Sequence, residues 1–413
     1  MAETFWRAGA RAAEWVLNSA ARLDVTTLRF LVALGVVLRV LLIGVTAGSN
    51  DIFTWERFGR QIDARGVLDE YRVVPRFNHP PLMGLWAQAA VRIADGTSIP
   101  FRIVFKLLPF SSDVVAIWLI WSSARRQGGD LHAWRAAAVF STSLVSIVIT
   151  GHHGNTDSVC AMLALVSAIL VADGRAPFAA GLALAAALNV KLIPLVLLPA
   201  MALLLTDRRA VVRFGAGLGF GLVPFLPAAV FAGEAFYRNV VAYQPRPRWW
   251  GIHLLLFSLA DLPRVGPWFE RIDVRYTEIA RYVIMASSLA LGLWARWRRR
   301  SAIEVAALGL ATFLLLAPAV GVQYLAMIVP VLVLTDLRRA SVWSLVAGIF
   351  LVAVYLHYQQ EWYPYRSRHR GPLPMSVQLV GLCTWVLLAE FLTARLSRRD
   401  VALGESRPAA PAR

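Results

Sequence analysis

Apolar runs recur along the whole 413-residue chain, and many of them approach the length of a bilayer span. Hydrophobic residues make up 58% of the sequence and charged residues only 16%. A soluble helical protein of this length would expose much more charge, because it must cover a water-facing surface. The pattern therefore predicts an all-α fold whose helices cross a membrane repeatedly, and it disfavours a large soluble α-helical core.

The apolar runs predict a polytopic transmembrane helical bundle of about twelve spans. Several runs are short for a hydrocarbon core of about 30 Å, which takes roughly 20 helical residues. Residues 177–205 are therefore either two half-length helices or one long tilted helix. The expected spans lie near residues 26–47, 103–124, 133–150, 158–173, 177–190, 192–205, 211–231, 278–295, 302–317, 321–335, 341–358 and 374–395.

The two ends of the chain differ from the bundle that they flank. Residues 1–25 mix apolar side chains with arginines and glutamate, which indicates an interfacial helix on the cytoplasmic leaflet. The transmembrane domain is expected to cover residues 26–396. The remaining tail, 397–413, is rich in alanine and proline near its end and is expected to be cytoplasmic and disordered.

Arginines cluster in the connectors between apolar runs, and the formal net charge is +17. Such a charge is also typical of nucleic-acid-binding proteins, but arginines so placed set membrane orientation and need no nucleic-acid partner. Five connectors predicted to be cytoplasmic hold thirteen arginines, whereas the shortest external turns hold only Lys191. We therefore expect a multi-pass protein of the cell (inner) membrane with both termini in the cytoplasm. The connector 359–373 disagrees, because it falls outside yet carries Arg366, Arg368 and Arg370.

Three predicted external segments are long, at about 48–102, 232–277 and 359–373. Long loops on a rigid scaffold often carry functional residues. In the first segment, residues 52–63 have the apolar spacing of an amphipathic helix lying on the outer membrane surface. Residues 82–94 predict a second short helix, which is interfacial or re-entrant.

Asp51 and His79 are candidate functional residues of this first external segment. Asp51 begins the amphipathic helix at the membrane–water interface. An aspartate there serves either as a helix N-cap or as a catalytic carboxylate. His79 precedes Pro80 and Pro81, so it is either a turn residue or a binding residue.

A short connector between two apolar runs holds four further candidates, which are His152, His153, Asn155 and Asp157. Histidines and an aspartate raise the hypothesis of a divalent cation as cofactor, although adjacent histidines rarely converge on one ion without further ligands. The alternative is a polar turn in which Asp157 caps the next helix. No cofactor follows with certainty.

The remaining candidates for donor or acceptor binding also fall on the external side. Lys191 interrupts an apolar stretch, and a lysine at membrane depth faces an anion, protein or water, or else snorkels to the interface. Gln323 and Tyr324 begin a span near the external surface, as binding residues or as an ordinary helix start with an aromatic anchor. Arg366 and Arg368, in the connector 359–373, are the last two candidates for donor or acceptor binding.

In this order along the chain, the motifs resemble those of the GT-C superfamily of membrane glycosyltransferases. The run 79–82, His-Pro-Pro-Leu, resembles the Tyr-Pro-Pro-Leu of the family's first external loop. Residues 151–155 resemble the Gly-His-Phe-Gln-Tyr-Asn stretch of dolichyl-phosphate-glucose-dependent glucosyltransferases. The lysine-and-proline break at 191–194 and the turn before Gln323 and Tyr324 are similar to those of bacterial and GPI-type mannosyltransferases.

The resemblance implies transfer of a hexose or pentose from a polyprenyl-phosphate donor to a lipid or glycan acceptor. It places the reaction at the outer face, among membrane lipids, and it implies inversion at the sugar carbon. The family's early-loop aspartate acts as a base, and that role falls here on Asp51. His79 replaces the family's tyrosine, and His153 and Gly154 stand where the eukaryotic enzymes have aromatic-rich residues, so the sugar stays open.

Two other classes of function remain at this point. A transporter or flippase of lipid-linked sugars predicts charged residues buried along a path through the bundle. The candidates, Arg39, Lys106, Asp113 and Glu304, are few and most lie toward one end of a span. A non-catalytic membrane scaffold would leave the external polar residues unexplained.

Overall fold

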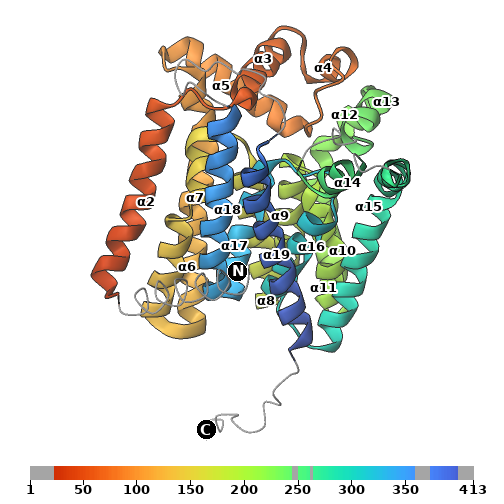
Figure 1. The fold of residues 1–413 in the computed structure, drawn as a ribbon. Coiled ribbons are helices and arrows are strands. Elements are labelled where there is room, and N and C mark those ends of the chain that lie inside the picture. The colour runs from red at the N-terminus through yellow and green to blue at the C-terminus, as the bar shows by residue number, and fades with distance from the viewer. Residues whose placement is uncertain (1–22, 244–249, 261–263, 359–372, 399–413) are drawn as a thin grey trace, which may run out of the picture.

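The computed structural model describes residues 23–243, 250–260, 264–358 and 373–398, and within these ranges every regular element is a helix (Figure 1). The predicted all-α class is therefore confirmed for this part of the chain. Most of the helix predicted at 1–25, the arginines at 366, 368 and 370, and the end of the predicted tail lie outside the described residues.

Five segments of the described chain are long and apolar enough to cross a membrane, so the protein is a helical membrane protein. Other apolar helices have only 10–17 residues, and the predicted count of twelve spans is not confirmed. The five segments are α2 (Val25–Val45), α6 (Phe101–Ser141), Arg208–Phe231, which includes α11 (Arg208–Gly221), η3 (Val223–Phe225) and α12 (Leu226–Phe231), α18 (Leu337–Tyr358) and α19 (Met375–Ser397).

The α6 segment is two antiparallel helices and not one long rod. Gly128 and Gly129 have non-helical backbone angles, and Gly129 has a φ of 78°. The ring centroids of Trp121 and Trp134 lie 5.8 Å apart, whereas 13 residues of straight helix would separate them by about 20 Å. The chain therefore turns back at the glycine pair, between the spans predicted at 103–124 and 133–150.

The shorter apolar helices fill the middle of the bundle. Every residue of α17 (Leu325–Thr335) up to Leu334 is buried, and α9 (Pro177–Val190) packs between α8 (Asp157–Asp173) and α11. The other elements are α7 (Leu144–Ile147), η1 (Val148–His153), η2 (Ile193–Leu197), α10 (Leu198–Leu204), α13 (Gly233–Phe236), η4 (Tyr237–Val241), α14 (Ile252–Ala260), α15 (Gly266–Trp297), α16 (Ala302–Leu316) and η5 (Val322–Tyr324).

Three helices lie across one end of the bundle (Figure 1): α3 (Asn50–Arg65), α4 (Val67–Val73) and α5 (Pro81–Thr97). The two amphipathic helices predicted for this loop are present. The apolar face of α3, which includes Trp55, Phe58 and Ile62, is however buried against protein, since α3 packs on α5 and Trp55 stacks on Phe105 of α6. The expectation that this face lies on lipid was therefore wrong.

Close contact between α3 and α5 depends on Gly59. A Cβ atom at this position would lie 2.5 Å from the carbonyl oxygen of Ala87. We expect Gly59→Ala to lower the free energy of unfolding by about 1–3 kcal/mol, because the backbones must separate. Thermal unfolding in detergent measures this. Gly96→Ala on α5, where nothing lies within 4 Å, is the control and is expected to have no destabilising effect. An unchanged melting temperature for Gly59→Ala contradicts the packing argument.

A buried polar network joins α2 to α6, α7 and η1. The Arg39 guanidinium lies 2.7 Å from the Asp113 carboxylate, and both side chains are almost fully buried. Ser146 and Thr150 donate to the same Asp113 oxygen at 2.6 and 2.9 Å, and Thr150 also contacts the Ser158 hydroxyl. The network fixes the start of η1, the π-helical turn that carries His152 and His153.

Candidate functional site

Asp51 lies in the first turn of α3, but it is not the cap of that helix. Ser49 is the N-cap, and its hydroxyl accepts from the Asp51 backbone N–H at 3.1 Å. The same hydroxyl donates to the His153 backbone carbonyl at 3.0 Å. The start of α3 is thus tied to the end of η1, and the Asp51 carboxylate remains available for other partners.

The Asp51 carboxylate is held by two side chains, one from the last residue of η1 and one from the connector that follows it. One oxygen lies 3.0 Å from His153 Nε2 and accepts from Asn155 Nδ2 at 2.7 Å. Gly154, between these two residues, has a φ of 70°, and a Cβ there would lie 2.5 Å from Ile52. The Asp51 side chain is 39% exposed, whereas that of His153 is 7% exposed. The carboxylate is therefore fixed in position yet open to a reactant.

The charge of Asp51 follows from these neighbours. Burial alone would raise the pKa of its carboxyl, but the His153 imidazole beside it and the Lys191 ammonium outweigh that penalty and hold the pKa below its usual value. Its place in the first turn of α3 acts in the same direction. Asp51 is accordingly ionised at neutral pH and can accept a proton.

A second buried pair lies near the first. Lys191 Nζ is 2.7 Å from an Asp157 oxygen, with side chains 11% and 0% exposed, and the ammonium lies 4.3 Å from the centre of the Tyr324 ring. Lys191 is therefore paired inside the protein and does not snorkel. Thr156 is the N-cap of α8, without a side-chain bond, so the suggestion that Asp157 caps this helix was wrong.

His79 closes the α3 side of the site. Its ring centroid lies 4.3 Å from that of Trp55, and its carbonyl accepts from the Tyr71 hydroxyl at 2.6 Å. Burial, with a smaller contribution from the Lys191 charge, lowers the pKa of His79 to about 3, against a weak opposing effect of Asp51. His79 is therefore neutral at physiological pH.

This environment of His79 predicts a loss of stability in mild acid. The folded protein resists protonation of His79, whereas the unfolded chain takes up the proton near pH 6.5. Stability is thus complete above pH 6.5 and falls below it, by up to about 1.4 kcal/mol per pH unit. His79→Gln should flatten this slope in denaturant titrations between pH 6.5 and 4.5, a window above that in which Asp51 titrates. An unchanged slope contradicts the assignment.

A family model of glycosyltransferase family 87 matches residues 93–318, more than half of the chain. The chain belongs to glycosyltransferase family 87. Family 87 is a family of GT-C-type membrane glycosyltransferases, so the protein is an enzyme and the resemblance to the GT-C superfamily is confirmed. The finer similarity to dolichyl-phosphate-glucose glucosyltransferases or GPI-type mannosyltransferases is not shown. No curated protein matches the sequence.

The family 87 match contains only part of the site. His153, Asp157 and Lys191 lie within it, whereas Asp51 precedes it and Tyr324 follows it. The structure brings these residues, distant in sequence, to the α3–α5 end of the bundle. These described candidates, which the sequence predicted to lie on one side of the membrane, thus gather at one end of the bundle.

Two of the predicted residues have other surroundings. His152 is fully buried, and its ring centroid lies 5.3 Å from that of Tyr355. Gln323 is buried, with its side chain close to the backbone of Gly321. Within the described part of the chain, no hydrogen bond or ion pair joins either of them to the Asp51 carboxylate. Among the described residues, no group of three or more His, Cys, Asp or Glu side chains is arranged to hold a metal ion.

Two residues near His153 and Gly154 were not among the site residues that the sequence predicted. The Tyr355 hydroxyl, on α18, lies 2.5 Å from His153 Nδ1. Lys106 on α6 is fully buried, and its ammonium donates to the Thr46 hydroxyl at 3.2 Å. Tyr355 carried no signal, because a tyrosine near the end of a span is usually an interface anchor.

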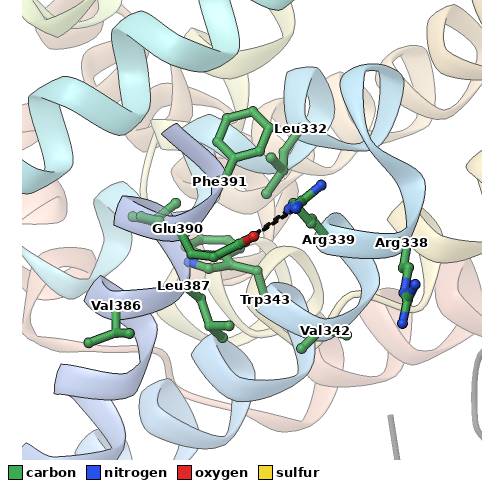
Figure 2. A pocket seen from close by; sticks show the side chains of 10 residues that line it. Leu332, Arg338, Arg339, Val342, Trp343, Val386, Leu387, Glu390 and Phe391 are labelled. Atoms are coloured by element: carbon green, nitrogen blue, oxygen red, sulfur yellow. Dashed lines mark hydrogen bonds and ion pairs between the residues drawn. The ribbon is translucent and has the colours of Figure 1, made fainter. Parts of the chain in front are cut away.

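Two cavities help to locate the reaction. Figure 2 shows one of about 490 Å³ among α17, α18 and α19, crossed by the Arg339–Glu390 ion pair. It lies at the far end of the bundle from Asp51. Another, of about 520 Å³, lies between α3, α5 and α6 and is lined by Ile52, Phe53 and Arg102 among others, but not by Asp51. The second cavity therefore lies at the α3–α5 end of the bundle, the end that carries Asp51.

Proposed function

We propose that this family 87 enzyme transfers a hexose or pentose from a polyprenyl-phosphate donor to a hydroxyl of a lipid or glycan acceptor, with Asp51 as general base. The observation that carries the proposal is the Asp51 carboxylate, which is ionised, partly exposed and held by His153 and Asn155. A base in this state can take the proton of an acceptor hydroxyl that comes within hydrogen-bond reach.

The proposed reaction is one inverting displacement. The acceptor oxygen attacks the anomeric carbon while its proton passes to Asp51. The bond from that carbon to the phosphate oxygen breaks at the same time, and polyprenyl phosphate leaves with the bonding electrons. Inversion follows because the base and the leaving phosphate stand on opposite faces of the sugar ring.

The cavity between α3, α5 and α6 suits such a donor. Arg102 lies at its wall, and a guanidinium binds phosphate oxygens with two parallel hydrogen bonds. Phe53, whose side chain is 46% exposed, and Phe101 offer an apolar surface for the first isoprene units. A polar wall next to an apolar one matches a phosphate attached to a hydrocarbon chain.

The distribution of arginines supports a reaction on the outer side of the cell (inner) membrane. Arg208 and Arg338 lie at the starts of α11 and α18, Arg296 lies at the end of α15, and Arg125 precedes the turn at Gly128 and Gly129 inside α6. The lower ends of α11 and α15 lie opposite the α3–α5 end of the bundle (Figure 1). Arginine-rich connectors face the cytoplasm. The described chain also begins and ends at that arginine-rich end, which favours cytoplasmic termini and a site facing outward.

A flippase of lipid-linked sugars has less support. Among the residues that the structure describes, the charged side chains buried in the bundle are largely paired with one another, as Arg39 with Asp113 and Lys191 with Asp157, and form no charged path. Membership of a glycosyltransferase family also favours chemistry at the site.

The test is sugar transfer by the purified protein in nanodiscs, with a panel of polyprenyl-phosphate hexoses and pentoses and a membrane lipid extract as acceptor. We expect one donor to yield glycosylated lipid and free polyprenyl phosphate. Parallel reactions with EDTA show whether a divalent cation takes part. No transfer from any donor, together with movement of donor across vesicle membranes, would overturn the proposal in favour of the flippase.

A further inference from the structure

The His153 ring stands between two hydrogen-bond partners from different helices. Nε2 faces the Asp51 carboxylate of α3 at 3.0 Å, and Nδ1 faces the Tyr355 hydroxyl of α18 at 2.5 Å. Tyr355 is only 5% exposed. Asp51, His153 and Tyr355 thus form a chain of three groups that runs from the open site into the interior.

The position of each proton in this chain follows from Asp51. An ionised carboxylate only accepts hydrogen bonds, so His153 Nε2 must carry a hydrogen to bind it. A neutral imidazole then has its lone pair on Nδ1, and the Tyr355 hydroxyl is the group that donates to it. Asn155 Nδ2 also lies 3.4 Å from Nε2, but its shorter bond, at 2.7 Å, is to Asp51.

We propose that Tyr355 is a positioning residue, which fixes His153 in the tautomer whose Nε2–H donates to the catalytic carboxylate of Asp51. Donation by Tyr355 also polarises the ring, and successive hydrogen bonds in a buried chain strengthen one another. Tyr355 therefore acts on the base through His153 without touching a substrate. The inference deepens the proposed function and rests on it only in the role given to Asp51.

Other charged or titratable groups around His153 come from several elements, and the test must separate Tyr355 from them. Lys106 of α6 lies close to Gly154, the charge of Lys191 acts on Asp51, and His79 is a further titratable group on the α3 side. His152 neighbours Tyr355 from the same turn as His153. All of these residues are unchanged in Tyr355→Phe, which removes only the tyrosine hydroxyl. The His153→Gln background then separates the hydrogen bond to His153 from any other contact of that hydroxyl.

The experiment is a double-mutant cycle of Tyr355→Phe and His153→Gln, in which the measured quantity is the titration midpoint of the Asp51 carboxyl. A water-soluble carbodiimide modifies protonated carboxyls, and mass spectrometry of the Asp51 peptide against pH gives the midpoint of its titration in the purified full chain. Glutamine at position 153 can still donate an N–H to Asp51 but has no tautomer for Tyr355 to fix. Tyr358→Phe, one turn further along α18 and 37% exposed, is the matched control.

We expect Tyr355→Phe to move the labelling midpoint of Asp51 upward by about 0.5–1 pH unit, because His153 becomes a weaker donor. In the His153→Gln background the same change should move it by less than 0.2 unit. Tyr358→Phe should leave it unchanged. Equal shifts in both backgrounds, or no shift in the wild type, would overturn the inference, since Tyr355 would then act by packing or not at all.

Transfer kinetics provide the second measurement. Tyr355→Phe should lower kcat about tenfold with little change in the KM for donor, and the acid limb of the pH profile should move upward with the labelling midpoint. Labelling needs no substrate, so it tests Tyr355 even if no donor is transferred. Absence of transfer with the expected labelling shifts contradicts the proposed function alone, whereas transfer without those shifts contradicts only the role of Tyr355.

Discussion

Asp51→Asn is expected to lower kcat for sugar transfer by about a thousandfold, with a much smaller effect on donor binding. Asparagine keeps the size of the side chain but cannot accept a proton, and general base catalysis typically contributes 10²–10⁴-fold. The amide would also present an N–H or a weaker acceptor to His153 and Asn155, which now hold the carboxylate at 3.0 and 2.7 Å. Single-turnover transfer in nanodiscs measures the chemical step directly.

Asp63→Asn on the same helix is the matched control for Asp51→Asn. Asp63 is 38% exposed, close to the 39% of Asp51, but it pairs with Arg92 on the surface and has no contact with His153. Its substitution should leave kcat within about twofold, because exposed ion pairs contribute little. Full activity of Asp51→Asn would remove Asp51 from the base role, while family 87 membership would stand.

The sequence predicted that the candidate residues lie at one end of the molecule. The order of the apolar runs indicates on which side of the membrane each connector lies, because successive spans cross in opposite directions. Asp51, His153 and Lys191 each border an apolar run, and helices that cross in alternation bring such borders to a common face. The sequence also predicted that the chain reverses near residue 128, because a glycine pair and charged residues separate the apolar runs at 103–124 and 133–150.

The sequence could not predict which side chains pair. For Asp157 the sequence left two interpretations, a binding residue or a helix cap. An unpaired carboxylate is costly at the depth of its surroundings, and Lys191 is the cation within reach. The apolar face of α3 looked like a lipid-facing surface, because hydrophobic spacing is the same whether lipid or α5 covers it. Tyr355 was missed for a similar reason, since its role depends on a histidine 202 residues away.

Lys191→Met is expected to lower the free energy of unfolding by about 3–5 kcal/mol, the largest loss among these substitutions. It leaves the Asp157 carboxylate, which is 0% exposed, without its cation, and a buried unpaired charge is strongly destabilising. The second oxygen, Oδ2, already has no hydrogen-bond partner, so no other group takes over. Chemical unfolding in detergent measures the loss. Arg92→Met breaks a pair of similar length on the surface, at 2.6 Å, and should cost less than about 1 kcal/mol.

The double variant Lys191→Met with Asp157→Leu separates the structural role of the pair from a role in the reaction. Removing both charges should restore stability to within about 1 kcal/mol of the wild type, since apolar replacements of a buried pair are often neutral or stabilising. Transfer should nevertheless stay at least tenfold lower, because the Lys191 charge helps to keep the pKa of Asp51 low and would attract the donor phosphate. Recovery of both stability and transfer would show that Lys191 has only a structural role. The prediction that it binds a substrate would then be wrong.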